Sequence, residues 1–112
     1  MTRNGDAFAR DADLPWEPAG EGVVRKVLTY QDGVMMVRVR FEAGAVGPPH
    51  THPHVQCSLV ESGVFDITIA GRTERLGPGD SFLVPSEALH GAQNIEAGTL
   101  LDVFTPMRAD FV

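Results

Sequence analysis

Hydrophobic and polar residues alternate along much of the chain, which predicts β-strands rather than helices. In the segment VMMVRVRF, apolar residues occupy one face, and methionine and arginine occupy the other. The first face carries Val37, Val39 and Phe41, and the second carries Met36, Arg38 and Arg40. A period of two is that of a strand, whose successive side chains point to opposite faces. We expect the arginine face to be solvated, and substrate binding by Arg38 and Arg40 is the alternative.

Other short runs bounded by turn residues predict further strands. They lie at 23–30, on both sides of 61–63, at 73–76, at 81–85 and at 99–105. About eight short strands without a convincing helix predict an all-β sandwich or barrel. Residues 1–22 lack such a pattern and are expected to form an N-terminal arm before a barrel domain at 23–112. Trp16 in this arm is expected to dock on its own domain or on the partner subunit of a homodimer.

Composition narrows the possible functions. The 112 residues suit one domain, and 15 acidic against 9 basic side chains give a net charge of −6. This charge disfavours nucleic acid as a partner, since nucleic-acid binding depends on lysine and arginine. No apolar run approaches the roughly 20 residues that span a membrane, and the first residues lack an apolar leader. We therefore expect a cytoplasmic domain with no membrane contact. Cys57 is the one cysteine and is expected to be a packing residue on the face opposite Gln56.

The histidines are concentrated in two places, which suggests a metal site. His50, His52, His54 and Gln56 have the same parity, so one strand through them would place their side chains on one face. His90 follows a later strand, and a fold rich in hairpins could bring it to the first group. For His54, an exposed or supporting role is favoured over contact with metal or substrate.

The last predicted strand contains an aspartate where apolar residues are expected. Asp102 lies between Leu101 and Val103, although aspartate is disfavoured in strands. One interpretation is an exposed strand face with Phe104 partly uncovered. The other places Asp102 inside the barrel as an acid/base, with Phe104 as an apolar wall. Arg108 would then reach the mouth of the barrel and bind a substrate carboxylate.

Two gapped motifs in the chain resemble those of the cupin superfamily. The first motif is matched by Gly44, His50, His52, Gln56 and Gly63, with glutamine in place of the usual glutamate. The second is matched by Gly79, Pro85, His90 and Asn94, with Glu87 in place of the motif glycine. The resemblance implies a single-domain cupin fold, a double-stranded β-helix or jelly-roll barrel with a metal in its mouth.

The same resemblance implies which side chains hold the metal. The expected ligands are His50, His52, Gln56 and His90. A neutral glutamine leaves a divalent ion with its full charge, which favours polarisation of a carbonyl or stabilisation of an oxyanion. One divalent transition-metal ion is expected, and Ni, Fe, Mn, Co and Zn all remain possible.

More specific segments are similar to the KdgF family of pectin-degradation cupins. These are LPWE in the arm, GPPHTHPHVQ, GPGDSFLVP and the ending DVFTPMRADF. The family implies ring opening of 4,5-unsaturated monouronates, released from pectin or alginate by lyases, to linear 4-deoxy-5-keto uronates. It also implies functional roles for Asp102, Phe104 and Arg108. The anionic sugar would be the small-molecule partner.

Two other functions remain open at this point. Another metal-dependent cupin enzyme, such as an iron dioxygenase, would use the same neutral ligands. A non-catalytic cupin that binds sugar acids would need the arginine but not an acid/base beside a Lewis acid. Oxygen consumption would distinguish the first alternative, and tight uronate binding without turnover the second.

Overall fold

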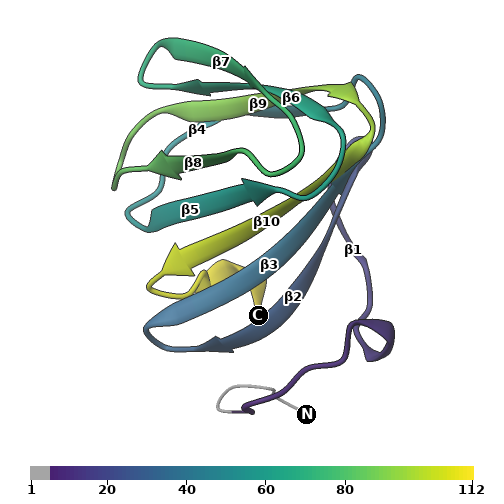
Figure 1. Cartoon of the computed structure of the whole chain (residues 1–112). Helices are drawn as coiled ribbons and strands as arrows, with labels where there is room; N and C mark the ends of the chain where they lie inside the picture. Colours follow the sequence, from purple (N-terminus) through teal and green to yellow (C-terminus); the bar gives the residue numbers. More distant parts are fainter. Residues whose placement is uncertain (1–5) are drawn as a thin grey trace.

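The computed structural model describes residues 6–112, and nearly all regular structure in that part of the chain is β-strand. Two antiparallel sheets face each other (Figure 1). In spatial order the larger sheet comprises β1 (Glu17–Gly20), β2 (Val23–Gln31), β3 (Val34–Phe41), β10 (Gly98–Thr105), β5 (Val55–Val60) and β8 (Ser81–Val84). The smaller sheet comprises β4 (Val46–His50), β9 (His90–Glu96), β6 (Val64–Ile69) and β7 (Arg72–Leu76). This arrangement confirms the predicted all-β barrel.

Two short 3-10 helices accompany the strands. The first, Asp11–Asp13, precedes β1, and the second, Ala109–Phe111, follows β10. Figure 1 shows the second helix, near the C-terminus, beside the end of the larger sheet. In the described part of the chain, no helix is long and apolar enough to cross a membrane.

The inner faces of the two sheets meet in an apolar core. Val60 and Phe65 have no exposed surface, and the Phe65 ring packs edge-on against Phe41 with centroids 5.1 Å apart. Val37 is also fully buried, so the apolar face of 34–41 is the interior one. Burial of each such side chain contributes about 1.5–3 kcal/mol. This core fixes the orientation of the strands that carry the polar interior residues.

Gly63 marks a close approach between two turns. Its φ is +80°, and a Cβ atom there would lie 2.5 Å from the carbonyl oxygen of Glu96. An L side chain would therefore be both strained and in collision with main chain. The last glycine of the first sequence motif is thus explained by packing.

Ion pairs and a stacked ring cover the outer face of the larger sheet. Arg38 donates to Asp11 at 2.7 Å and to Glu61 at 2.9 Å. The guanidinium carbon of Arg40 lies 4.2 Å from the centroid of the Trp16 ring. Both arginines are therefore on the solvent side, as the favoured interpretation predicted. Trp16 docks on its own chain.

Two sequence predictions about the histidine segment are corrected by the structure. β4 ends at His50 and β5 begins at Val55, so no single strand passes through 50–56. Pro53 lies in the intervening bend, where a residue without an N–H interrupts strand pairing. Cys57 does face away from Gln56, but it is exposed rather than packed.

Residues 6–112 contain ten strands rather than the predicted eight, because two of them show little alternation of apolar and polar residues. β1 has only four residues and pairs with β2, so part of the predicted arm joins the larger sheet. β9 has the sequence HGAQNIE, whose inward positions include polar His90 and Asn94. Residues 1–5 of the arm lie outside the described part, and the division into arm and barrel domain stays a prediction.

Candidate metal centre and active site

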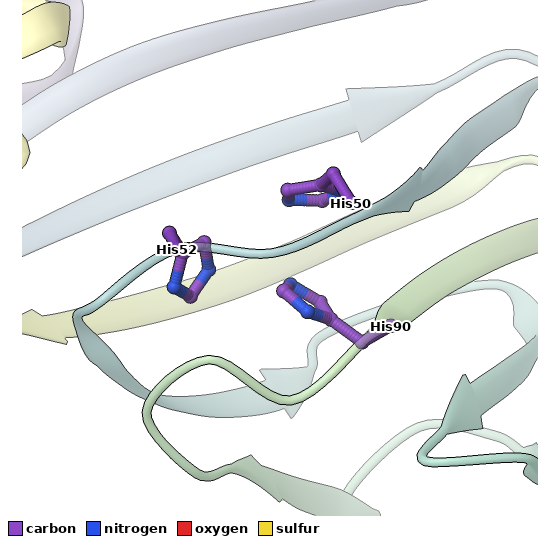
Figure 2. Close-up of side chains that lie close together, drawn as sticks. All are labelled: His50, His52 and His90. Carbon is purple, nitrogen blue, oxygen red and sulfur yellow. The ribbon is translucent and has the colours of Figure 1, made fainter.

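Three histidines from separate segments converge, of which His52 and His90 are buried and His50 is exposed. His50 ends β4, His52 lies in the following loop, and His90 begins β9. Antiparallel pairing sets His50 directly opposite His90. The ligand-capable nitrogens of the three rings all lie within 4.8 Å of one another. Figure 2 shows the rings gathered between the three segments. The histidine convergence expected from the sequence is therefore present, by a different route from the one predicted.

Main-chain carbonyls fix the orientation of all three imidazoles. Each ring has its Nδ1 close to a carbonyl oxygen two residues away: His50 to Pro48 at 2.9 Å, His52 to His54 at 3.0 Å and His90 to Ala88 at 2.9 Å. Because a carbonyl oxygen can only accept, each Nδ1 carries the hydrogen and each Nε2 keeps a lone pair. This is the tautomer that binds a metal through Nε2.

The surroundings of the Nε2 atom of His90 are suited to metal binding. It is buried and has no hydrogen-bond partner within residues 6–112. Burial lowers the pKa of His90, with further lowering by nearby His50, His52 and Arg108. The neutral ring is therefore favoured, and its lone pair is free. Buried polar atoms without partners are rare in proteins, so this one indicates a ligand-binding position.

Gln56 supplies an oxygen to the same cluster. Its side chain on β5 is buried, and its Oε1 lies 3.0 Å from Nε2 of His52. With Nδ1 of His52 protonated, both facing atoms are acceptors, which repel unless a cation or proton lies near them. The oxygen of Gln56 thus lies next to one of the three clustered histidine nitrogens. Nitrogen and oxygen ligands of this kind suit a divalent transition metal.

A hydrogen-bond chain connects the cluster to Asp102. The amide nitrogen of Gln56 donates to Oγ of Ser58 at 3.0 Å, and the Ser58 hydroxyl donates to Oδ1 of Asp102 at 2.6 Å. The single hydroxyl hydrogen of Ser58 goes to the carboxyl group, so its lone pairs receive the amide. This directs Oε1 of Gln56 toward the histidines. Gln56, Ser58 and Asp102 form what we call the buried polar chain.

Asp102 lies inside the barrel, as the functional interpretation of its sequence position predicted. It is 7% exposed. Burial raises its pKa to about 6, although the hydrogen bond from Ser58 and the charge of Arg108 act in the opposite direction. A carboxyl group with a pKa near neutrality can both accept and release protons in the physiological range.

Two aromatic rings and an arginine form a wall beside Asp102. The guanidinium carbon of Arg108 lies 5.1 Å from the centroid of Phe104 and 4.3 Å from that of Phe111. Arg108 also donates from Nε and Nη2 to the carboxylate of Asp110 at 3.1 and 2.9 Å. That guanidinium holds the pKa of Asp110 below its usual range. Phe104 and Arg108 are therefore neighbours in the structure, and their roles in substrate binding stay predictions.

His54 is outside the histidine cluster and links two parts of the site. Its Nε2 donates to the carbonyl oxygen of Met107 at 3.1 Å. Its ring packs edge-on against His52 and Phe104, with centroids 5.5 and 6.3 Å away. His54 thus holds the C-terminal segment against the histidine loop, which is the supporting role favoured from the sequence.

Many of these groups border one cavity of about 360 Å³. Its volume is within the range of pockets for small molecules. Polar lining is contributed by His50, Gln56, His90, Asp102 and Arg108, and also by Arg25. Sequence analysis missed Arg25, Ser58 and Phe111. The first two could have been found by parity, because Arg25 has the same parity as Val23 and Val27, and Ser58 has the same parity as Gln56. Phe111 had no periodic signal.

Known proteins are similar to this chain in fold and in sequence. A family described as "Cupin domain" matches residues 37–104. The pectin degradation protein KdgF of Dickeya dadantii is 41% identical over 104 residues, 91% of this chain and 94% of that protein. An RmlC-like cupin from Shewanella frigidimarina has a TM-score of 0.95 at 36% identity, covering 99% of this chain and 100% of its own. KdgF from Halomonas sp. has a TM-score of 0.90 at 36% identity, covering 95% and 98%. The chain therefore belongs to the cupin family and, within it, to the KdgF proteins.

Proposed function

We propose that this protein opens the ring of 4,5-unsaturated monouronates released from pectin and yields linear 4-deoxy-5-keto uronates. The observation that carries the proposal is the placement of buried Asp102 in one cavity with the three-histidine cluster and Arg108. An acid/base, a cation site and a carboxylate partner are three groups that this isomerisation can use. Membership of the KdgF proteins supports the substrate class.

The donor set fits a divalent metal ion. His50, His52 and His90 would bind it through Nε2, since their ligand atoms lie within 4.8 Å of one another. Gln56 would bind it through Oε1, which lies 3.0 Å from Nε2 of His52. A bound ion supplies a Lewis acid, which stabilises negative charge on a nearby substrate oxygen. Ni, Fe, Mn, Co and Zn all accept nitrogen and oxygen donors, and metal analysis of the purified protein distinguishes them.

The reaction is a proton transfer coupled to ring opening, with no change in composition. The anomeric hydroxyl loses a proton, the bond from C1 to the ring oxygen breaks, and C1 becomes an aldehyde. The enolate left at C5 then takes a proton at C4 and becomes a ketone. Asp102 moves one of these protons, either from the anomeric hydroxyl or onto C4. A pKa of about 6 permits either direction near neutral pH.

The remaining residues bind the sugar. Arg108 borders the cavity, and its guanidinium provides a local positive charge that attracts the substrate carboxylate. This local charge acts although the chain carries a net charge of −6 overall. Phe104 presents an apolar ring beside the histidines, with its centroid 5.7 Å from that of His52. A sugar ring can pack on such a surface while its hydroxyl groups face the polar side of the cavity.

The test is Asp102→Asn, followed by the loss of the ultraviolet absorbance of the C4=C5 bond. We expect the turnover rate to fall about 100-fold or more, because general acid/base groups contribute that much. Asp66→Asn is the control, since Asp66 pairs with Arg75 on the other sheet and does not border the cavity. Wild-type turnover by Asp102→Asn would contradict the role. Substrate-dependent oxygen consumption, or uronate binding without turnover, would favour the alternative functions.

The wider proposal includes a homodimer in the cytoplasm that also accepts alginate-derived uronates. The support for a dimer is an apolar outer face on β5 and β8, where Leu59 and Leu83 are 39% and 57% exposed. Light scattering of the wild type and of Leu83→Lys tests this part. A monomeric wild type would contradict it without affecting the proposed chemistry.

A further inference from the structure

Arg25 places a second guanidinium in the cavity. It lies on β2 between Val23 and Val27, both of which are buried. In the antiparallel pairing of β2 with β3 its partner is Val39, another residue that borders the cavity. Because residues of the same parity share a face, the Arg25 side chain points into the barrel. Its half-buried side chain therefore borders the cavity.

No ion pair neutralises Arg25 within residues 6–112. The ion-paired arginines of that part of the chain are Arg38, Arg72, Arg75 and Arg108. The Nε atom of Arg25 is buried and has no hydrogen-bond acceptor. A buried donor of a charged group without an acceptor is unfavourable. An anion in the cavity would offset the Arg25 charge through the terminal nitrogens of the guanidinium.

The Phe111 ring holds Arg25 in place without using its hydrogens. The guanidinium carbon of Arg25 lies 3.9 Å from the centroid of Phe111. The same ring has the guanidinium carbon of Arg108 at 4.3 Å. Stacking on an aromatic face orients the guanidinium plane and leaves its edge free for a carboxylate. Two arginines around one ring therefore form a cationic rim on the cavity.

The two arginines differ in what they can still bind. Arg108 already uses Nε and Nη2 for the carboxylate of Asp110. That pair of nitrogens is an edge suited to bidentate contact with a planar anion. In Arg25 the guanidinium has no ion pair within residues 6–112, so its two terminal nitrogens can serve a planar anion in the cavity.

We propose that the terminal nitrogens of Arg25 bind the substrate carboxylate and make the site select acids over neutral sugars. The proposal rests on the proposed function, because it assigns the carboxylate of that substrate. Arg108 then adds charge and one further donor at the rim. Selection follows because a neutral ester accepts weaker hydrogen bonds and leaves the Arg25 charge without a partner.

The experiment compares Arg25→Met with wild type on the unsaturated uronate and on its methyl ester. We expect the KM for the acid to rise about 10- to 100-fold, the size of effect of hydrogen bonds to charged groups. The KM for the ester should change little. Arg72→Met is the matched control, because it removes the same charge from an exposed side chain on β7.

Arg25→Lys keeps the proposal testable if Arg25→Met does not fold. Lysine retains the charge and the apolar stem but loses the fork, so the KM for the acid should rise by a smaller factor, about 10-fold. An unchanged KM in a folded variant would overturn the proposal. So would an equal rise for acid and ester, since Arg25 would then act only by packing on Phe111.

A binding measurement separates this proposal from the proposed function. If the wild type does not turn over the unsaturated uronate, the proposed function fails, and calorimetry with galacturonate and galactose tests Arg25 alone. Weaker binding of galacturonate by Arg25→Met, with galactose binding unaltered, would support acid selection by Arg25. Equal galacturonate binding by both proteins would overturn it.

Discussion

The two faces of the larger sheet carry similar polar groups in very different surroundings. On the outer face, Asp11, Arg38 and Glu61 form ion pairs that are open to water; we call them the outer ion-pair cluster. On the inner face, the buried polar chain connects Gln56, Ser58 and Asp102. Both groups are well paired, yet only the inner one has a shifted carboxyl pKa near neutrality.

The difference shows that pairing alone does not make a polar group functional. Water screens the outer charges, so their attraction is weak and their loss is tolerated. Inside the barrel each donor and acceptor has one available partner, and removal of a partner leaves a buried group unsatisfied. We therefore expect substitutions on the inner face to have much larger effects on both rate and stability than those on the outer face.

The largest expected effect comes from the cation site. His90→Ala, or removal of metal by a chelator, should lower turnover of the unsaturated uronate about 1,000-fold or more. A Lewis acid contributes several kcal/mol to such a reaction, and each 1.4 kcal/mol is a factor of ten. Activity and metal content are measured together. Metal added back should restore the chelated wild type but not the variant, and a variant with normal metal content and rate would refute the ligand assignment.

Ser58→Ala should have the next largest effect, because it cuts the buried polar chain at its centre. The amide of Gln56 and the carboxyl of Asp102 would each lose a partner, which costs about 1–3 kcal/mol of unfolding free energy. Misorientation of both groups should lower turnover about 10- to 100-fold. Denaturant unfolding and the absorbance assay measure the two effects. Ser62→Ala, an exposed serine on the turn after β5, is the control, and equal effects of the two variants would contradict the comparison.

In the metal-free protein, the pH dependence of the unfolding free energy tests the contrast between the inner and outer faces of the larger sheet. Burial raises the pKa of Asp102 from 3.8 to about 6, so the folded state binds more protons than the unfolded state between these values. This contribution to stability is fully present below the lower value and is lost as pH rises through the higher one. The loss is roughly 3 kcal/mol. Unfolding between pH 4 and pH 7 measures it.

Asp102→Asn should remove that pH dependence, since an amide does not titrate. Asp66 provides the opposite sign: Arg75 lowers its pKa, so its contribution is present at neutral pH and is lost as pH falls. A stability profile for Asp102→Asn that parallels the wild type would show that Asp102 is not the group responsible.

The smallest effect is expected on the outer face. Arg38→Met breaks its ion pairs with Asp11 and Glu61 and should lower the unfolding free energy by less than about 1 kcal/mol. Turnover should be unchanged. Added salt should weaken the wild type slightly and the variant less, because exposed charges are screened. A large loss of activity would remove the distinction between the two faces.

The sequence predicted the fold and most of the site because both leave periodic traces. Alternation identified β3, short runs between turn residues identified most other strands, and gapped motifs identified the histidines and Gln56. Asp102 was detectable because an aspartate between two apolar strand residues requires a partner or a function. These signals depend on local spacing, which a sequence records directly.

The features that were not predicted from the sequence depend on three-dimensional geometry, which residue spacing does not record. The bend at Pro53 replaced the single strand expected through His50 and Gln56, and only the pairing of β4 with β9 shows how the rings still meet. Glu87 has a φ of +66° and donates its N–H to the carbonyl of His52 at 2.8 Å. Glycine adopts a positive φ readily, which accounts for the glycine that the cupin motif has at this position. Cys57 was misplaced because the outer face of β5 has no cover in the described chain.

The main-chain carbonyls that orient the three imidazoles have a consequence for how this protein can evolve. An acidic side chain that oriented a histidine could be lost by one mutation, whereas a carbonyl of the peptide chain is retained in every substitution. The orientation of the three rings therefore depends on the path of the main chain, whereas the residues proposed to bind the sugar are side chains of β2, β10 and the C-terminal segment. These two properties can drift independently. A lineage can exchange the residues that recognise the sugar while its metal centre is inherited intact.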